Sequence, residues 1–371
     1  MADTGRLAVT GMAWTTPLGN ELDGVWKRLC AAESGFAPCP GPASLRNRLA
    51  AAVPGVALDL PPAQRMLAIA IDAARRALQS APGPVDSETR LVVGTSLGSY
   101  LEDEPPAATT HAWADELARE LGLTKPPLVV CTACSSGADA IRLAAELLRS
   151  GAEQRCLCGG ADILTDGKRL SHSALGTMSP TLLRAFDIRR DGTLLGDGAA
   201  FLLLEREGGP RRPLAFYRGG GGASDAQSMT APDATGAAVK LAIERSLTDA
   251  GLTLADVATV NAHGSATPLN DQTEREALRS TFGTAERPVV FATKGNFGHS
   301  LGATGAIEAV ALILALRAGE VPPIVNLEQP DPGFPLPLPM GKSLRLAGRI
   351  GISVTLGFGG FDTSVVFEAA V

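Results

Sequence analysis

The chain contains 371 residues, of which 45% are hydrophobic and 19% charged, and its formal net charge is −6. This composition is typical of a folded protein with a large interior and excludes a disordered chain. The acidic balance and an aromatic content of 4% argue against a nucleic-acid-binding surface. The N-terminus lacks a signal-peptide pattern and the apolar stretch at 309–316 is short for a bilayer span, so we expect a cytoplasmic protein whose six cysteines are reduced.

The first half of the chain alternates strand and helix patterns. Strands are predicted at 6–14, 90–96 and 128–136, and apolar residues at helical spacing predict a helix over 63–81. The third strand leads into a long helix, and a glycine-rich turn with a strand at 196–205 closes the series.

The second half repeats this series. A helix is predicted over 235–251 and a strand followed by a glycine-containing loop over 257–265. A strand, loop and long helix follow from 288, and a glycine-rich turn with a strand ends the chain at 356–368. The glycine-rich stretch 219–224 is predicted to be a loop. Strands that alternate with helices in two similar series indicate an internally duplicated α/β fold with largely parallel sheets.

Both long helices are unusually apolar. In the first, the charged side chains form one narrow stripe at spacings of three and four residues, from Asp139 to Arg149. In the second, Glu308 is the only charged residue between His299 and Arg317. Helices with so little polar surface are predicted to be buried, and their N-terminal N–H groups favour anions.

Cys134 lies where an apolar strand gives way to the first buried helix. A thiol near a helix N-terminus is expected to have a stabilised thiolate, as a sulfur nucleophile requires. A buried structural cysteine is the plainer alternative. The Cys131-x-x-Cys134 spacing also admits a redox pair or metal ligands, but Cys131 alternates with buried positions and is predicted to pack within the strand.

Two of the four histidines occupy positions typical of ligand-binding groups. His263 and His299 both lie in glycine-containing loops that follow strands, where α/β proteins bind their ligands. A hydrogen-bonded loop histidine is the alternative for each. His111 and His172 lack such a setting and are predicted to be surface or loop residues. The histidine spacing matches no metal-binding motif.

One motif favours a different enzyme class. The sequence GTSLG at 94–98 matches the nucleophile elbow of serine hydrolases, and Asp197 and His263 could complete a triad with Ser96. An elbow needs a helix directly after the serine, however, and the acidic, proline-rich sequence that follows argues against one. A glycine-rich loop at a strand end is the preferred interpretation.

Taken together, the motifs resemble those of the β-ketoacyl-acyl carrier protein synthases of the thiolase superfamily, specifically the elongating Cys-His-His type. The resemblance runs nearly end to end through VTGMAWTTPLGN, TACSSG, RAFDIRRDGTLLGDGAAFLLLE, AHGSATPLND, KGNFGHSLGATGAIE, PPIVNLEQPDP and GFGGFD. It implies an α/β, thiolase-like fold of two pseudo-duplicated βα halves in α-β-α-β-α layers. The half formed by 1–207 would carry the nucleophile, and the half formed by 208–371 the two histidines and the lysine.

The resemblance also implies a reaction. Cys134 would accept an acyl chain as a thioester, and His263 and His299 would polarise the carbonyl of a malonyl unit while carbon dioxide leaves. Two neutral imidazoles that donate N–H bonds suit a developing oxyanion. The reaction would be a decarboxylative Claisen condensation in fatty acid, polyketide or polyene biosynthesis, catalysed by an acyltransferase without cofactor or metal.

Further residues match supporting positions of the family. The backbone N–H groups of Cys134 and Phe358 would form the oxyanion hole, and the Phe358 side chain would gate access between the half-reactions. Ser265 and Thr267 match the hydroxyls that hold the pantetheine arm of the carrier.

Lys294 and Glu308 stand fourteen residues apart, the separation expected of the family's paired lysine and glutamate. A lone glutamate on a buried helix is costly unless a cation pairs with it. Lys294 is therefore expected to orient and tune the histidine site and not to act as a nucleophile.

The implied partner is an acyl carrier protein that bears acyl and malonyl groups, and the chain is expected to form a homodimer or a heterodimer with a related ketosynthase-like subunit. Carrier proteins are acidic, so a local basic dock is needed. The candidates, by density of positive charge alone, are Arg184, Arg189, Arg190, Arg211 and Arg212.

The sequence departs from the family pattern at three places. Ser265 and Ala266 replace a common Thr-Gly pair, Asp362 stands where many members have asparagine, and the segment from Gly98 to Cys134 is short. These departures indicate a specialised synthase. They also leave open a chain-length-determining or scaffold subunit, although such partners commonly lack the nucleophile. A thiolase-like transfer without decarboxylation is disfavoured by the two-histidine pattern.

Overall fold

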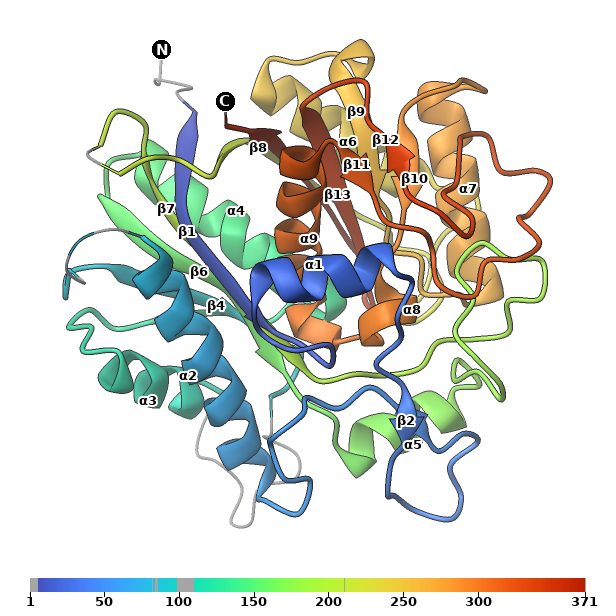
Figure 1. Ribbon diagram of the computed structural model, residues 1–371, viewed down its shortest axis with the longest axis horizontal. Coiled ribbons are helices and arrows are strands. Elements are labelled where there is room, and N and C mark those ends of the chain that lie inside the picture. The colour runs from blue at the N-terminus through green and yellow to red at the C-terminus, as the bar shows by residue number, and fades with distance from the viewer. Residues whose placement is uncertain (1–5, 82, 84–85, 99–109, 210, 371) are drawn as a thin grey trace.

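The structure is a computed structural model that describes residues 6–81, 83, 86–98, 110–209 and 211–370. The shortened segment noted in the sequence includes 99–109, which lie outside the described residues. Its centre is a ten-stranded sheet (Figure 1). In spatial order the strands are β10 (Val289–Phe291), β9 (Val257–Asn261), β13 (Ile350–Gly357), β14 (Phe361–Ala369), β8 (Ala215–Ser224), β1 (Leu7–Thr15), β7 (Gly198–Arg206), β6 (Arg155–Asp162), β4 (Arg90–Gly94) and β5 (Leu128–Val130).

The sheet consists of two halves with the same strand directions. From its outer edge, the first half pairs β5 with β4 and β4 with β6 in parallel, then β6 with β7 and β7 with β1 antiparallel. The second half repeats this with β10, β9, β13, β14 and β8. The internal duplication is therefore confirmed. The prediction of largely parallel sheets is wrong, because the third and fourth pairings in each half run antiparallel.

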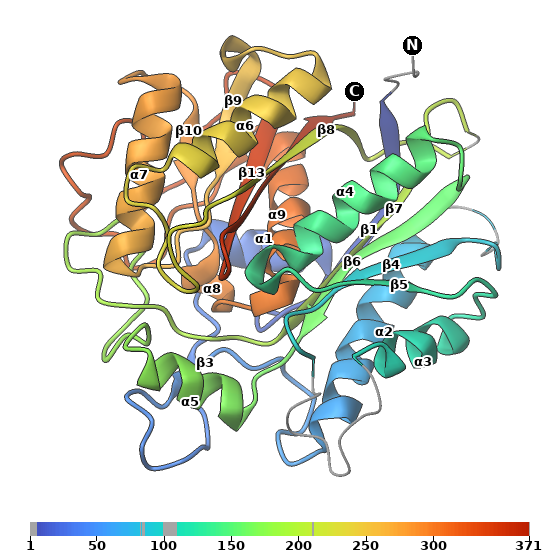
Figure 2. The ribbon, with the colours of Figure 1, turned by 180° about the vertical axis from the view of Figure 1, so that it is seen from behind.

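Helices separate and cover the two half-sheets. The two buried helices, α4 (Ser136–Arg149) and α9 (Thr304–Ala318), pack on each other and on strands of both halves. α2 (Pro62–Ser80) and α3 (Ala112–Glu120) cover the outer face of the first half, and α6 (Ala237–Ala250) and α7 (Pro268–Phe282) that of the second (Figure 2). This confirms the α-β-α-β-α layering. The remaining described helices are α1 (Leu22–Cys30), α5 (Asp166–Ala174) and α8 (Lys294–Phe297).

Small elements complete the described chain. Two-residue strands pair β2 (Ala37–Pro38) with β3 (Leu49–Ala50), and β11 (Glu320–Val321) with β12 (Leu344–Arg345). Short 3₁₀ turns precede both central helices, η1 (Ala133–Ser135) before α4 and η3 (Leu301–Ala303) before α9, and η2 (Leu254–Asp256) precedes β9. Both central helices thus begin with the same tight turn, in equivalent places of the two halves.

The glycine-rich stretch 219–224 is not a loop, as predicted, but part of strand β8. A Cβ on Gly221 would lie 2.3 Å from the carbonyl oxygen of Ala242 in α6, and one on Gly219 would lie 2.7 Å from the N atom of Ala250. Gly219 and Gly221 are therefore needed because α6 approaches the strand too closely for side chains there. Glycine's turn preference is overridden by this packing.

The central helix α9 is buried along nearly its whole length, from Thr304 to Leu316. Together with the turn η3 it forms an 18-residue apolar segment, Leu301–Ala318, with a mean hydropathy of 1.6. By length and composition this segment could cross a membrane. The prediction that the apolar stretch at 309–316 is short for a bilayer span is therefore corrected, because the apolar segment is longer than that stretch. Because 89% of it is buried inside the protein, it is a core helix here.

Candidate active site

The candidate nucleophile, Cys134, lies in η1 at the start of α4, and its residue is 4% exposed. The preceding residue, Ala133, has a positive φ of 50°, which turns the chain sharply from β5 into the helix. The Phe358 N–H donates to the Cys134 sulfur. Burial nevertheless raises the pKa of the Cys134 thiol to about 11, although this N–H and the Lys294 ammonium oppose the rise. The expected thiolate is therefore not favoured in the resting site, because desolvation outweighs its donors.

Cys131 does not pack inside a strand, as predicted. It follows the last residue of β5, its side chain is exposed, and its Sγ donates to the Ser96 carbonyl at 2.6 Å. The strand ends one residue earlier than the apolar pattern suggests, so the alternation does not extend to Cys131. The two cysteines of the C-x-x-C motif thus lie in different surroundings, and neither is in a disulfide. Within the described residues, no group of three His, Cys, Asp or Glu side chains is placed to hold a metal ion.

His263 and His299 meet edge to face, with ring centroids 5.1 Å apart. His263 follows β9, and His299 precedes η3 and α9. The Lys294 ammonium, which has only protons to give, contacts His263 Nδ1 at 3.2 Å, and the Leu301 N–H donates to His299 Nδ1 at 3.3 Å. Both Nδ1 atoms accept, so the proton of each neutral ring is on Nε2.

Both imidazoles are neutral. Burial lowers the pKa of His263 and of His299 well below the usual value, and the Lys294 ammonium lowers both further. A neutral ring with its proton on Nε2 can donate one hydrogen bond without carrying charge. The site therefore offers two N–H donors to an oxygen that gains negative charge.

Lys294, at the first position of α8, is 1% exposed and pairs with Glu308 of α9 at 2.5 Å between Nζ and Oε1. Nζ also donates to the backbone carbonyl of His263. Burial raises the pKa of the Glu308 carboxyl to about 7, against the lowering effect of the ammonium. The Lys294–Glu308 ion pair predicted from the sequence is formed. The same ammonium contacts both the Nδ1 atom and the backbone carbonyl of His263, so it fixes the His263 ring.

Sequence reasoning missed a carboxylate that holds the first histidine loop. Glu274 of α7 is fully buried and accepts from the backbone N–H groups of His263 and Gly264, each at 2.7 Å. Asp271, one turn earlier, accepts from the Ala266 N–H at 3.0 Å. Burial raises the pKa of Glu274 to about 8. The sequence signal was an acidic residue on the α7 face at the spacing of buried positions.

Phe358 lies in the turn between β13 and β14, and this turn is tied to the segment after β8. The Gly359 N–H donates to the Met229 carbonyl and the Asp225 N–H to the Gly360 carbonyl, both at 2.8 Å. Gly360 has a φ of 80°, and a Cβ there would lie 1.7 Å from the Asp225 carbonyl oxygen. These contacts fix the backbone that carries the Phe358 N–H.

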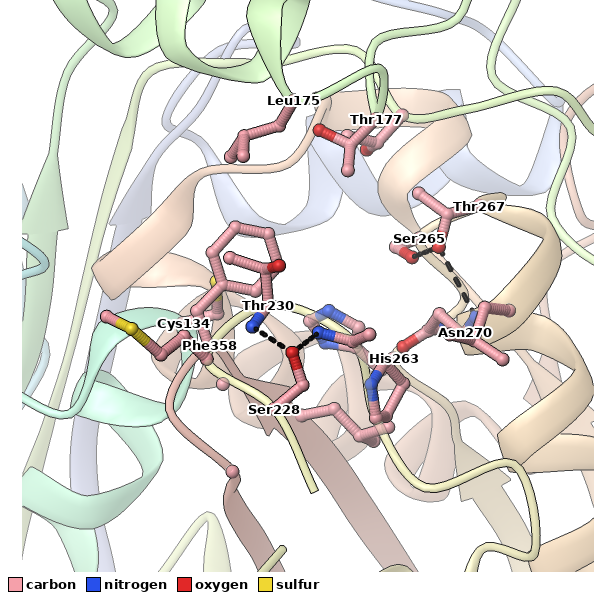
Figure 3. Close-up of a pocket in the computed structure, with 18 of the residues that line it drawn as sticks. Cys134, Leu175, Thr177, Ser228, Thr230, His263, Ser265, Thr267, Asn270 and Phe358 are labelled. Carbon is pink, nitrogen blue, oxygen red and sulfur yellow. Dashed lines mark hydrogen bonds between the residues drawn. The ribbon is translucent and has the colours of Figure 1, made fainter. Parts of the chain in front are cut away.

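The candidate residues surround one cavity of about 340 Å³. Cys134, both candidate histidines, Phe358, Ser265 and Thr267 all line it. Figure 3 shows Cys134 and Phe358 on one side of the cavity and Ser265 and Thr267 on the other. The hydroxyls of Ser265 and Thr267 are 3.2 Å apart. All the residues predicted to act on substrate are thus brought to a single cavity.

The cavity also contains the departure noted at Asp362. This residue is 3% exposed, and its Oδ2 has no hydrogen-bond partner among the described residues. Burial and the nearby Asp225 raise the pKa of Asp362 to about 7. Two acidic residues, Asp225 and Asp362, therefore line the cavity.

His172 is not a surface or loop residue, as predicted. It belongs to α5, is 7% exposed and lines the cavity. Its ring stacks on Phe358 with centroids 5.7 Å apart and lies 6.5 Å from the ring of His299. Burial lowers the pKa of His172 to about 4. The ring of His172 is buried through contacts with segments distant in the sequence, which include Phe358 and His299. His111, by contrast, is exposed, as predicted.

The serine triad is not assembled. The Ser96 hydroxyl donates to Asp162 at 2.6 Å, and Asp197 pairs with Arg65 at 3.1 Å. His263 is held by Lys294 instead. The hydrolase alternative therefore lacks its geometry.

The arginines proposed as a dock are mostly engaged within the chain. Arg189 pairs with Asp187 and Glu328, and Arg190 pairs with Asp331. Arg211 pairs with Glu205, whereas Arg212 is exposed. Charge density along the sequence therefore does not identify a free basic patch.

Comparison with known proteins identifies the family that has this site. The model for the β-ketoacyl synthase N-terminal domain matches residues 4–208, and that for the C-terminal domain matches 214–328. The chain belongs to the β-ketoacyl synthase family. The family resemblance inferred from the motifs is confirmed, and the activity is that of a β-ketoacyl-acyl carrier protein synthase, an acyltransferase.

Individual relatives agree. The chain is 31% identical to "3-oxoacyl-[acyl-carrier-protein] synthase 2" of Synechocystis over 98% of both proteins, and 38% identical to the chloroplastic synthase II of Arabidopsis thaliana over 72% of this chain and 52% of the relative. Among solved structures, a β-ketoacyl synthase from Burkholderia phymatum is 28% identical with a TM-score of 0.89 over 99% of this chain and 100% of that one. The ishigamide ketosynthase/chain length factor is 26% identical with a TM-score of 0.88 over the same shares.

Proposed function

We propose that the enzyme condenses an acyl group held on Cys134 with a malonyl unit delivered by an acyl carrier protein. In the first half-reaction the Cys134 sulfur attacks the acyl thioester, and the backbone N–H groups of Cys134 and Phe358 stabilise the oxyanion. The C–S bond to the carrier breaks, and the thiol proton passes to the departing carrier sulfur. The resting Cys134 is a protonated thiol, and it therefore carries the proton that the departing carrier sulfur needs. No separate base has to take this proton to solvent.

In the second half-reaction the carboxylate of the malonyl unit leaves as carbon dioxide. The electron pair of the broken C–C bond passes into an enolate, whose oxygen accepts the Nε2–H bonds of His263 and His299. The enolate carbon then attacks the acyl carbonyl on Cys134, the C–S bond breaks, and the sulfur regains a proton from water. The observation that carries this proposal is the pair of neutral Nε2–H donors in one cavity with the buried thiol.

The remaining site residues have supporting roles in the proposal. Lys294 holds the His263 tautomer and Glu308 balances its charge, so both act as positioning residues. Ser265 and Thr267 are proposed to hold the pantetheine arm, because their adjacent hydroxyls line the cavity. The side chain of Phe358 is proposed to gate the cavity between the half-reactions. This divides the chemistry between 1–207, with the nucleophile, and 208–371, with the histidines and the lysine.

The partner of the reaction is proposed to be an acyl carrier protein in the cytoplasm. One solved neighbour of this fold, 24% identical, is described as a type II PKS acyl-carrier protein in complex with its ketosynthase. Strand β5 forms one edge of the sheet, is partly exposed and leads directly to the nucleophile turn. We propose that a second ketosynthase subunit, identical or related, pairs with this edge.

The experiment is acylation followed by intact-protein mass measurement. The purified enzyme, incubated with acyl carrier protein bearing an acyl group, should gain one acyl mass, and Cys134→Ala should gain none. An unmodified wild-type enzyme, alone or with a ketosynthase partner, would favour the chain-length-determining or scaffold role. The assembled cysteine and histidines support the active role. Condensation that persists in Cys134→Ala would overturn the proposal.

A further inference from the structure

The cavity contains an amide side chain that the proposed mechanism does not use. Asn270 of α7 lines the cavity and is 6% exposed. Figure 3 shows it on the same side of the cavity as Ser265 and Thr267, the two residues whose hydroxyls are proposed to hold the pantetheine arm. A ligand held by these hydroxyls would therefore also meet the side chain of Asn270.

Two carboxyl groups fix the orientation of the Asn270 amide. Its Nδ2 donates to Oδ1 of Asp271 at 3.2 Å and to Oε2 of Glu274 at 2.9 Å. An NH₂ group has two protons, so both are used. A flipped amide would lose both bonds and would place its oxygen against carboxyl oxygens that already accept from backbone N–H groups. The Nδ2 atom therefore faces the two acidic residues, and Oδ1 is the free end of the side chain.

The Oδ1 atom of Asn270 is open to a ligand. Among the described residues, none donates a hydrogen bond to it. It also keeps accessible surface, in contrast to the Oδ1 atoms of Asn261 and Asn296, which are enclosed without a partner. A carbonyl oxygen on a cavity wall takes its hydrogen bond from water or from a ligand. Asn270 therefore offers the cavity one acceptor and no donor.

The two hydroxyls supply a donor beside this acceptor. Ser265 and Thr267 share one hydrogen bond at 3.2 Å, which uses one of their two hydroxyl protons. Thr267 Oγ1 also accepts from the backbone N–H of Asn270 at 3.4 Å, which uses a lone pair and no proton. Whichever hydroxyl donates to the other, one O–H proton remains for a ligand. This side of the cavity thus presents one donor and one acceptor.

One donor beside one acceptor matches a secondary amide, whose carbonyl accepts and whose N–H donates. The pantetheine arm contains two secondary amides, whereas an acyl chain of hydrocarbon and a malonyl unit contain no N–H group. We propose that Asn270 Oδ1 accepts the N–H of a pantetheine amide whose carbonyl accepts from the Ser265–Thr267 pair. This inference rests on the proposed function, and it makes Asn270 a residue that recognises the arm.

This contact has a specific kinetic signature. The amides of the arm do not react, so the contact is made equally with the bound substrate and with the transition state. Loss of the contact should therefore raise KM for the carrier and leave kcat nearly unchanged. Glu274, which holds the Asn270 amide, also accepts from the backbone N–H of His263, so the arm is positioned on the same carboxyl group as the histidine loop.

The test uses acyl carrier protein loaded with the same acyl group on three arms: the natural arm and two analogues, each with one amide N–H replaced by an ester oxygen. The rate of Cys134 acylation is followed by intact mass. For at least one analogue, the wild-type enzyme should show a KM about tenfold to a hundredfold higher than for the natural arm, since the Asn270 oxygen loses its donor. Asn270→Ala should bring this ratio of KM values close to one. Ser228→Ala, which Figure 3 places away from Asn270 across the cavity, should keep the wild-type ratio.

The outcomes separate this inference from the proposed function. If the wild-type enzyme is acylated on Cys134 from the natural arm, but neither analogue shows a penalty that depends on Asn270, the amide assignment is wrong. A purely structural role of Asn270 would raise the KM for all three arms by one factor and leave the ratio unchanged, which also overturns the assignment. If the wild-type enzyme acquires no acyl group from the natural arm, the proposed function itself fails.

Discussion

Replacing Lys294 by methionine tests the buried ion pair at the centre of the site. The variant removes an ammonium that contacts His263 Nδ1 at 3.2 Å and Glu308 at 2.5 Å, and leaves Glu308, which is 1% exposed, without its cation. Breaking a buried pair from one side costs about 3–5 kcal/mol of unfolding free energy. For a chain of 371 residues, 4 kcal/mol corresponds to a fall in Tm of about 5 °C.

The stability lost in Lys294→Met should increase as the pH rises above 7. In the native wild-type protein Glu308 has a pKa of about 7, above its unfolded value, so the native state binds the extra proton below pH 7. Without the ammonium this pKa rises further. Native Glu308 then stays protonated above pH 7, while the unfolded chain is ionised. The unfolding free energy of the variant should therefore fall by about 1.4 kcal/mol per pH unit above pH 7, relative to wild type.

Urea unfolding from pH 6 to pH 9 measures this difference, and a double variant supplies the control. Lys294→Met with Glu308→Leu removes both charges at similar volume and should restore most of the stability. It should not restore condensation, because the His263 tautomer is no longer held, and loss of one oxyanion donor costs about 10²–10³ in rate. A single variant as stable as wild type at every pH, or a double variant with full activity, would refute the reasoning.

Three further outcomes are expected. Gly221→Ala should lower the unfolding free energy, measured by urea titration, by about 1–3 kcal/mol, because its Cβ would lie 2.3 Å from a backbone oxygen of α6. The control variant Gly222→Ala should change this free energy by less than about 0.5 kcal/mol, because its Cβ would meet only a flexible arginine side chain. In a Cys131→Ala variant, iodoacetamide should alkylate Cys134 at pH 8 about 100-fold more slowly than it alkylates a thiol with the ordinary pKa of 9.0. The alkylation rate should rise with pH up to about pH 11. An alkylation rate that levels off near pH 7 would contradict the effect of burial on this thiol. The glutamine of Glu274→Gln has one acceptor oxygen, so it cannot accept from the N–H groups of both His263 and Gly264. The variant should lose about 1–3 kcal/mol of unfolding free energy and condense more slowly. Wild-type stability and a wild-type condensation rate would show that these two hydrogen bonds matter little.

The residues of the site could be predicted because their signals are local. Cys134, His263 and His299 each lie in a short turn between a strand and the next element, with a glycine in the turn for both histidines, and such turns are visible in the sequence. Lys294 could be predicted from its charge partner, since a lone Glu308 on an apolar helix needs a cation. The structure brings all four together, and burial supplies the neutral state of the two imidazoles.

The remaining features depend on contacts between distant segments. His172 occupies an amphipathic helix, and its ring is buried beside Phe358 and His299, which are more than a hundred residues away in the sequence. Glu274 lies at the spacing of the buried positions of α7, but only the fold shows that it accepts from the N–H groups of the loop after β9. The strand at 219–224 contains glycines for close helix packing, a reason that no local rule separates from a turn.

The measurement that tests the account most directly is discharge of the acylated enzyme in a single turnover. Cys134 is first loaded with a labelled acyl group, and malonyl-acyl carrier protein is then added while carbon dioxide, acyl-enzyme and β-ketoacyl product are followed by radiolabel and intact mass. We expect the three signals to change at one rate in wild type, and His263→Ala and His299→Ala to load normally but to discharge about 10²–10³ times more slowly. Product that appears without passage through the Cys134 adduct, or histidine variants that discharge at the wild-type rate, would contradict it.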